Sequence, residues 1–150
     1  MKINTYTYKE LSADQLYEIL RLRAEIFVVE QNCAYQDIDL KDQKAIHLTG
    51  EINKKIIAYT RIFKKGDYFN NSSIGRVLVK KDYRKKDYGK LIMKKSIEII
   101  KTDPEEEEIE LSAQKYLTEF YSDLGFKKTG KEYLEDNIPH IKMILKIRGY

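Results

Sequence analysis

The amino-acid sequence predicts one domain of the α/β (α+β) class, in which helices cover a β-sheet. Strand-like runs and helical stripes are mixed along the chain rather than separated into two halves, which is typical of this class. The 150 residues are enough for one ordinary domain with a core, and 42% of them are hydrophobic. No repeat or low-complexity linker divides the chain, so residues 1–150 are expected to form a single domain.

The first elements are a strand and a helix. Residues 2–8 alternate as a strand does. A capping box follows, in which the Ser12 side chain accepts a hydrogen bond from the Gln15 N–H, and it marks the start of a helix. This helix is expected to run for about four turns, because one stripe with helical spacing contains Leu16, Ile19, Leu20, Arg23 and Phe27.

A hairpin, a loop, a strand and a second helix are expected next. Residues 45–51 and 56–63 are apolar-rich runs that the pair Asn53-Lys54 would join as an antiparallel hairpin. Residues 64–73 are polar and predict a loop, and residues 74–79 predict a strand. A second helix is indicated by a stripe at Tyr88, Leu91, Ile92, Ser96, Ile99 and Ile100.

The last third of the chain predicts shorter elements. Residues 109–111 predict a short strand, and residues 116–124 predict a short helix. That helix should end at Gly125, because glycine is favoured at the position that follows a helix. Residues 126–129 and 141–147 predict two further strands.

Composition narrows the classes of protein to consider. The single cysteine, Cys33, cannot form an internal disulfide and offers no basis for a metal cluster, so we expect no metal site. There is no apolar run of 18 residues and no apolar stretch of the signal-peptide kind at the start. We therefore expect a cytoplasmic protein with no membrane role. The net charge of +4 is too small to indicate a nucleic-acid partner by itself.

An anion-binding site is predicted where the strand at residues 74–79 is followed by a helix. The intervening segment, Lys80 to Lys86, carries five cations in seven residues. The first turn of a helix has unpaired N–H groups and the positive end of the helix dipole, and both favour phosphate. Gly89 removes a Cβ where a ligand must approach the backbone. Neither the GxxxxGK[ST] nor the GxGxxG pattern is present.

This segment resembles a motif of a known superfamily. Arg84-x-x-Asp87-x-Gly89, placed after a strand that ends Val77-Leu78-Val79, resembles motif A of the GNAT superfamily, Arg/Gln-x-x-Gly-x-Gly/Ala. In that superfamily the loop wraps the pyrophosphate of coenzyme A with backbone amides. The sequence departs from the pattern at Asp87, whose carboxylate is unfavourable beside a pyrophosphate unless it faces solvent.

Two further segments resemble the same superfamily. Residues 111–114 and 120–126, with Phe120-Tyr121 and Gly125-Phe126, resemble motif B. Residues 22–39 and the tail 135–143 resemble the ElaA-like branch. The resemblance covers residues 15–145 and implies the GNAT fold. That fold has a central mixed, mostly antiparallel sheet of six to seven strands, flanked by about four helices.

The resemblance implies acetyl transfer from acetyl-coenzyme A to an acceptor, usually an amine, by direct attack in a ternary complex. The Val79 N–H would polarise the thioester carbonyl, and Tyr121 would protonate the leaving thiolate. The coenzyme A site implied by the family comprises Val77, Leu78, Val79, Arg84, Lys85, Lys86, Asp87, Tyr88, Gly89, Lys90, Gln114 and Tyr121.

A general base is needed as well, because an ammonium has no lone pair with which to attack. The candidates are His47, His140, Glu30 and Glu51, and the two histidines rank first because imidazole titrates near neutral pH. His140 has the better context, since it lies in the tail that resembles the ElaA-like branch. The residues expected to line the acceptor pocket are Glu30, Gln31, His47, Arg61 and His140.

Two functions of other classes stay open on the sequence alone. A non-catalytic acyl-coenzyme A sensor would keep the phosphate loop but would need neither Tyr121 nor His140. A nucleic-acid-binding protein could use Lys80 to Lys86, although such proteins usually spread basic residues over a face with interleaved aromatics, so we expect no nucleic-acid partner. The expected partner is a small-molecule or peptide amine, and the protein is expected to be a monomer or a homodimer.

Overall fold

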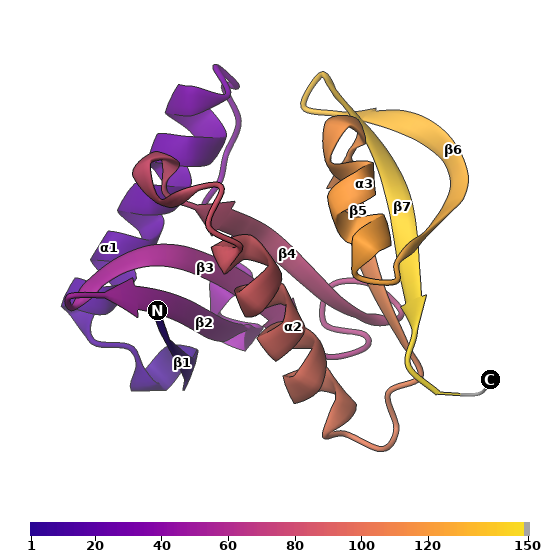
Figure 1. The fold of residues 1–150 in the computed structure, drawn as a ribbon, viewed down its shortest axis with the longest axis horizontal. Coiled ribbons are helices and arrows are strands. Elements are labelled where there is room, and N and C mark those ends of the chain that lie inside the picture. Colours follow the sequence, from indigo (N-terminus) through magenta and orange to yellow (C-terminus); the bar gives the residue numbers. More distant parts are fainter. Residues whose placement is uncertain (149–150) are drawn as a thin grey trace.

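The computed structural model describes residues 1–148 and shows a seven-stranded sheet covered by helices (Figure 1). The strands are β1 (Lys2–Thr7), β2 (Ile46–Ile52), β3 (Lys55–Phe63), β4 (Ser72–Val79), β5 (Glu108–Gln114), β6 (Lys127–Glu135) and β7 (Ile138–Lys146). The α-helices are α1 (Ala13–Arg23), α2 (Tyr88–Lys101) and α3 (Thr118–Asp123), and α1 continues as a π-helix over Ala24–Glu30. Short 3₁₀ turns occupy Tyr8–Glu10, Asp42–Lys44, Lys81–Tyr83 and Lys115–Leu117. Within residues 1–148 no helix is long and apolar enough to cross a lipid bilayer.

The sheet is mixed and mostly antiparallel, as predicted. The strand order is β1-β2-β3-β4-β5-β7-β6. Every neighbouring pair is antiparallel except β4 and β5, which are parallel. β4 and β5 pair at only two positions, Ser72 with Ile109 and Ser73 with Glu110. Beyond Ser73 the two strands diverge, and Figure 1 shows the sheet opening between them.

Local signals in the sequence account for several boundaries. The capping box is confirmed: the Gln15 N–H donates to Ser12 Oγ at 3.1 Å, and the Ser12 N–H donates to Gln15 Oε1 at 2.8 Å. Asn53 and Lys54 have positive φ angles of 51° and 64°, which gives the two-residue turn that suits a β-hairpin. Gly125 follows α3 with φ +97°, the conformation that glycine allows at a helix end.

The core lies on both faces of the sheet. Ile19 and Leu22 of α1 pack with Tyr59 and Leu78 on one face. On the other face, α2 and α3 pack with the neighbouring strand positions, and the fully buried side chains there include Ile92 and Met93. Burying a side chain of this size is worth about 1.5–3 kcal/mol. This packing fixes the position of β3 and β4 beside the opening in the sheet.

The C-terminal strands are longer than the sequence indicates. β5 extends to Gln114, β6 runs to Glu135 and β7 begins at Ile138, whereas apolar runs suggest strands only at 109–111, 126–129 and 141–147. β6 is an edge strand whose side chains are mostly exposed. It is held through backbone pairing with β7, so its sequence shows no buried face.

Candidate active site

The diverging strands β4 and β5 open a cleft of about 770 Å³. Its floor is the free edge of β4, and its far wall is formed by β5 together with α3. The start of α2 and the turn between β6 and β7 also line it. The π-helix that follows α1 supplies the remaining wall.

A bulge in β4 contributes to this opening. Tyr59 faces Leu78 and Arg61 faces Gly75, so Arg76 and Val77 together oppose the single residue Thr60. Arg76 takes a positive φ of 50° at this point. A bulge bends its strand and increases its twist, which turns β4 away from β5.

The backbone of Val79 points into the cleft. The Lys80 N–H donates to the Ile57 carbonyl at 2.7 Å, and Val79 lies opposite Ala58, the next position along the ladder. Hydrogen-bonded and non-hydrogen-bonded pairs alternate between antiparallel strands. The N–H and C=O of Val79 are therefore directed away from β3, toward the side where β5 has already diverged.

The start of α2 is an uncapped helix N-terminus at the end of the cleft. Asp87 is the N-cap residue, but its side chain makes no capping hydrogen bond. Its φ of 61° is left-handed, which explains why the superfamily pattern has glycine here and why an aspartate still fits. The N–H groups of the first turn, at Tyr88, Gly89 and Lys90, thus lack a side-chain cap and are suited to an anion.

Arg84 is held by protein groups in this structure. Its guanidinium forms a bidentate pair with the Glu30 carboxylate at 2.8 and 2.7 Å, and its Nε donates to the Val79 carbonyl at 2.9 Å. The pair joins the basic loop to the end of the π-helix. Arg84 and Glu30, assigned by sequence to cofactor and acceptor, respectively, are thus direct neighbours.

Gly89 was expected to let a ligand approach the backbone, but in the structure it is protein side chains that lie close to it. A Cβ at this position would lie 3.4 Å from Cζ of Phe120 and 3.6 Å from Cγ2 of Val79. The glycine therefore lets the start of α2 approach α3 and β4, in addition to leaving space at the end of the cleft.

Tyr121 lies in the cleft wall on α3. Tyr121 is 7% exposed, and its ring packs edge-on against the rings of Phe120 and Phe126. Burial raises the pKa of the Tyr121 hydroxyl well above its usual value, so the hydroxyl keeps its proton at neutral pH. Within residues 1–148 no hydrogen-bond partner of this hydroxyl is found, which leaves the proton available to a ligand.

His140, on β7, also lines the cleft. Its Nδ1 is 2.7 Å from the carbonyl of Ile138, and its Nε2 is 3.3 Å from Oε2 of Glu135. Ser112 of β5 donates to the same Oε2 at 3.0 Å. The His140 ring stacks on Tyr133 at a centroid distance of 6.1 Å.

His47 lies outside the cleft, contrary to the expectation that it lines the acceptor pocket. It is fully buried, and its two ring nitrogens contact the Tyr59 hydroxyl at 2.6 Å and the Asp42 carbonyl at 2.9 Å. Because a carbonyl can only accept, Nε2 carries the proton and Nδ1 accepts from Tyr59. Burial also lowers the pKa of His47, which keeps the ring neutral.

Arg61 lines the cleft and belongs to a buried cluster of ion pairs, here called the Arg–Asp network. It pairs with Asp39 at 2.8 Å and with Asp42 at 3.0 Å. Arg23 pairs with Asp37 at 2.9 Å and with Asp42 at 2.6 Å. The whole network consists of Arg23, Arg61, Arg76, Asp37, Asp39 and Asp42.

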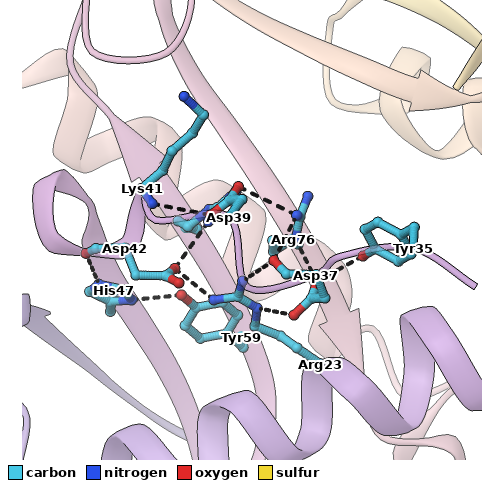
Figure 2. Close-up of polar contacts among 10 residues, drawn as sticks. Arg23, Tyr35, Asp37, Asp39, Lys41, Asp42, His47, Tyr59 and Arg76 are labelled. Atoms are coloured by element: carbon cyan, nitrogen blue, oxygen red, sulfur yellow. Dashed lines mark hydrogen bonds and ion pairs between the residues drawn. The ribbon is translucent and has the colours of Figure 1, made fainter. Parts of the chain in front are cut away.

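The network holds the segment between the π-helix and β2 against the sheet. Arg76, at the β4 bulge, reaches Oδ1 of Asp37 at 2.8 Å, and the Tyr35 hydroxyl donates to the same oxygen at 2.7 Å (Figure 2). Three guanidinium groups thus meet three carboxylates, and the cluster carries no net charge. The segment that resembles the ElaA-like signature is therefore explained here by packing, with Tyr35, Arg61 and Arg76 facing the cleft.

Most residues proposed from the sequence meet around the cleft. Three of them do not line it: His47, Glu51 and Lys86. Glu51 instead accepts a hydrogen bond from the Asn4 side chain on β1, and the Lys86 ammonium lies 5.8 Å from the ring centroid of Tyr83. Those that line it are Val77, Leu78, Val79, Arg84, Lys85, Asp87, Tyr88, Gly89, Lys90, Gln114, Tyr121, Glu30, Gln31, Arg61 and His140. Gln31 and Gln114 form a hydrogen bond of 3.0 Å with each other.

Sequence reasoning gave no role to Ser112, Glu135 or Arg76. The role of Arg76 depends on the bulge in β4, which turns its side chain toward Asp37 and which the sequence does not indicate. Ser112 and Glu135 lie 23 positions apart and meet because β5 and β6 both pair with β7. Two-residue alternation in a hairpin with a turn at Asp136-Asn137 was the one signal that could have placed Glu135 near His140.

Comparison with known proteins gives a consistent result. A family model described as an acetyltransferase (GNAT) domain matches residues 4–147. Protein ElaA of Escherichia coli (strain K12) is 40% identical over 142 residues, which cover 93% of each chain. The crystal structure of Escherichia coli ElaA superposes with a TM-score of 0.89 at 38% identity, covering 97% of this chain and 99% of that one. An acyl-CoA N-acyltransferase from Pseudomonas aeruginosa gives a TM-score of 0.89 at 32% identity, covering 96% and 98%.

More distant structures share the fold. An aminoglycoside 6′-N-acetyltransferase complexed with coenzyme A gives a TM-score of 0.75 at 14% identity, covering 100% of this chain and 99% of that one. That identity supports a common fold alone. The resemblance to the GNAT superfamily and to ElaA, inferred from the motifs, is confirmed by the family model and by the ElaA comparisons. The chain belongs to the GNAT acetyltransferase family.

Proposed function

We propose that this protein is an N-acetyltransferase that moves an acetyl group from acetyl-coenzyme A to a primary amine by direct attack in a ternary complex. One observation carries the proposal. A single cleft joins an uncapped helix N-terminus, a free strand edge, a protonated tyrosine and a histidine. These are the groups needed to hold a phosphate-bearing thioester and to manage the protons of an amine attack.

The residues at the α2 end fit the pyrophosphate of coenzyme A. The first-turn N–H groups of Tyr88, Gly89 and Lys90 have no capping side chain. Lys85 lines the cleft and adds a cation, while Asp87, which is exposed, must turn its carboxylate toward solvent. The family relative from Pseudomonas aeruginosa is named as an acyl-CoA N-acyltransferase, and the aminoglycoside enzyme was crystallised with coenzyme A.

The free edge of β4 fits the pantetheine arm, whose amides can pair with a strand edge. The Val79 N–H is directed into the gap and is suited to donate to the thioester oxygen, where negative charge develops during attack. Its carbonyl is occupied by Arg84 Nε, so we expect Arg84 to move or to share this oxygen when the cofactor binds. The cofactor itself supplies an acetyl group activated as a thioester.

Tyr121 and His140 handle the protons. The Tyr121 hydroxyl keeps its proton at neutral pH and is assigned as the donor to the leaving thiolate. His140 is assigned as the base that removes a proton from the acceptor ammonium, because it is the histidine that lines the cleft. His47, held between Tyr59 and Asp42, is not assigned a role in the reaction.

The acceptor is proposed to be a small-molecule or peptide amine, handled by a monomer or homodimer in the cytoplasm. The charges of Arg61 and Arg76, which line the cleft, are already matched by Asp37, Asp39 and Asp42, so this wall is expected to attract an anionic substrate only weakly. A nucleic-acid role for Lys80 to Lys86 has weaker support, since Arg84 in that cluster is neutralised by Glu30.

The test is release of free thiol from acetyl-coenzyme A in the presence of a panel of primary amines. We expect amine-dependent thiol release by the native protein, and a large loss of turnover in Tyr121→Phe. A non-catalytic sensor would instead bind acetyl-coenzyme A without releasing thiol with any amine. That outcome, with binding intact, would replace the enzyme by the sensor.

A further inference from the structure

We propose that Glu135 is the positioning residue of His140: its carboxylate holds the Nε2 edge of the imidazole toward the acceptor and stabilises the charge that this edge takes up. The inference rests on the proposed function, because it concerns the proton that the acceptor ammonium must lose. Glu135 acts through His140 rather than on the reacting carbon.

The β6–β7 hairpin places both residues. Asp136 and Asn137 form the two-residue turn between β6 and β7, with φ angles of 49° and 62°. Both central residues are left-handed, which is the type I′ geometry that matches strand twist. Glu135 therefore lies directly opposite Ile138, and His140 is two residues farther along the same strand. Two residues along a strand return to the same face, so His140 and Ile138 share a face.

The hydrogen bonds of His140 leave one nitrogen for chemistry. Nδ1 lies 2.7 Å from the Ile138 carbonyl, and a carbonyl can only accept. Nδ1 must therefore carry a proton, and the lone pair of the neutral ring lies on Nε2. Nε2 lies 3.3 Å from Oε2 of Glu135, so with the ring neutral two acceptor atoms face the same space, and a donor with two N–H groups can bond to both. The pair is thus arranged to attract one proton donor, and an ammonium N–H fits that need.

The carboxylate is itself oriented by a chain of donors. Ser112 donates to Oε2 of Glu135 at 3.0 Å, so the serine oxygen can accept from the Tyr133 hydroxyl, which contacts it. Tyr133 in turn stacks on the His140 ring. Within residues 1–148 no hydrogen bond or ion pair is made to Oε1 of Glu135, so this oxygen is available to a cation in the cleft.

The proton balance follows from this arrangement. The ammonium N–H gives its proton to Nε2 of His140, and the freed nitrogen lone pair forms the bond to the acetyl carbon as the carbon–sulfur bond breaks. The imidazolium is then doubly donating, to the Ile138 carbonyl through Nδ1 and to Glu135 through Nε2. Of the two protons that the nitrogen loses, one ends on the thiolate and the other passes from His140 to solvent.

The same geometry specifies the class of acceptor. A basic alkylamine arrives as an ammonium and depends on this pair, whereas an aromatic amine arrives neutral and does not need a proton removed before attack. We therefore expect the site to act on basic alkylamines, and we expect Glu135 to matter for these more than for aromatic amines.

The first test needs no acceptor. The chain has two histidines, so imidazole ¹⁵N resonances can be assigned, with His47 as an internal reference. We expect Glu135→Gln to move the Nε2 resonance of His140 while Nδ1 stays protonated and His47 is unchanged. The matched control is Glu132→Gln, on the same strand, where Glu132 pairs with Lys115 outside the cleft. This variant should leave the resonances of both histidines unchanged. An unchanged His140 Nε2 resonance in Glu135→Gln would overturn the inference.

The second test compares two amines of the same ring size, cyclohexylamine and aniline, with acetyl-coenzyme A. Cyclohexylamine is an ammonium at neutral pH and aniline is not. Glu135→Gln is expected to lower kcat at least about tenfold with cyclohexylamine and clearly less with aniline, with little change in KM for acetyl-coenzyme A. Equal losses with both amines would make the role of Glu135 structural and overturn the inference.

The same experiment separates this inference from the proposed function. If the native protein binds acetyl-coenzyme A but acetylates neither amine, the proposed amine chemistry is contradicted, and the resonance of His140 still decides whether Glu135 holds the ring. If the native protein acetylates both amines and Glu132→Gln behaves as native, a larger loss of kcat with cyclohexylamine than with aniline in Glu135→Gln is due to the Glu135–His140 pair.

Discussion

Replacing Asp42 with asparagine is expected to lower the free energy of unfolding by about 3–5 kcal/mol, the usual cost of removing one partner of a buried ion pair. Asp42 is 5% exposed, and its Oδ1 accepts from Arg23 at 2.6 Å and from Arg61 at 3.0 Å. Asparagine keeps the shape of the side chain but removes its charge. Two guanidinium groups that are 0% and 1% exposed would then have one fewer carboxylate to neutralise them.

Urea denaturation measures this effect directly. With a slope of about 2 kcal/mol per molar urea, a loss of this size moves the midpoint down by about 2 M at unchanged slope. The loss is a large part of the total stability of an ordinary domain, about 5–15 kcal/mol. The control is Glu18→Gln, which breaks an exposed pair with Arg21 and should cost no more than about 1 kcal/mol. A loss for Asp42→Asn as small as that of the control would refute the account of the network.

The pH dependence of stability gives a second check on the same residue. Burial alone would raise the pKa of the Asp42 carboxyl, but Arg23 and Arg61 outweigh it and hold this pKa below its usual value. The folded-state pKa is thus lower than the unfolded value of about 3.9. The stabilisation is therefore present above about pH 4 and is lost as the pH falls through the folded-state pKa. The difference between native protein and Asp42→Asn should shrink over that acidic range.

Three further variants test separate parts of the structure. Tyr121→Phe should lower kcat by about 10²-fold or more while changing KM for acetyl-coenzyme A little, as measured by thiol release; unchanged turnover at all pH values would contradict its role as acid. Gly125→Ala should cost more than about 1 kcal/mol in urea denaturation, because its φ is +97° and the new Cβ would lie 3.1 Å from Cδ1 of Leu145; a neutral result would contradict the strain argument. Asp87→Gly should tighten coenzyme A binding in calorimetry, since it removes a negative charge at the α2 N-terminus, while stability changes by less than about 1 kcal/mol; weaker binding would contradict the anion-site assignment.

Local features of the sequence predicted the elements that depend on neighbouring residues. The capping box at Ser12, the turn at Asn53-Lys54 and the glycine after α3 need only a few adjacent positions. The same holds for the strand, basic loop and helix start that form one end of the cleft. These segments also carry the superfamily motifs, so the family and its fold could be inferred before the structure was known.

Features that depend on distant residues could not be predicted in this way. The Arg–Asp network joins Arg23 to Asp37 and Asp42, and Arg61 to Asp39, across 14 to 22 positions of sequence. From the sequence alone, an arginine on a helix and a loop rich in aspartate would both be expected at the surface. For the same reason His47 seemed available to a substrate, although Tyr59 and the Asp42 carbonyl enclose it.

The extent of β6 was missed for a different physical reason. Residues 130–135 include Gly130, Lys131, Glu132 and Glu135, a composition without a buried face. An edge strand is stabilised by backbone hydrogen bonds to one neighbour, here β7, and these leave no apolar alternation in the sequence. The position of Glu135 beside His140 followed from that pairing and so was missed with it.

The central claim, that this cleft binds acyl-coenzyme A through the N-terminus of α2 and the edge of β4, is tested most directly by calorimetry. The native protein would be titrated with acetyl-coenzyme A, coenzyme A and pantetheine, at low and at physiological salt. The account predicts saturable one-to-one binding of both coenzyme A forms, weaker at higher salt, and much weaker binding of pantetheine, which lacks the pyrophosphate. No binding of either coenzyme A form, or equal binding of pantetheine, would contradict it.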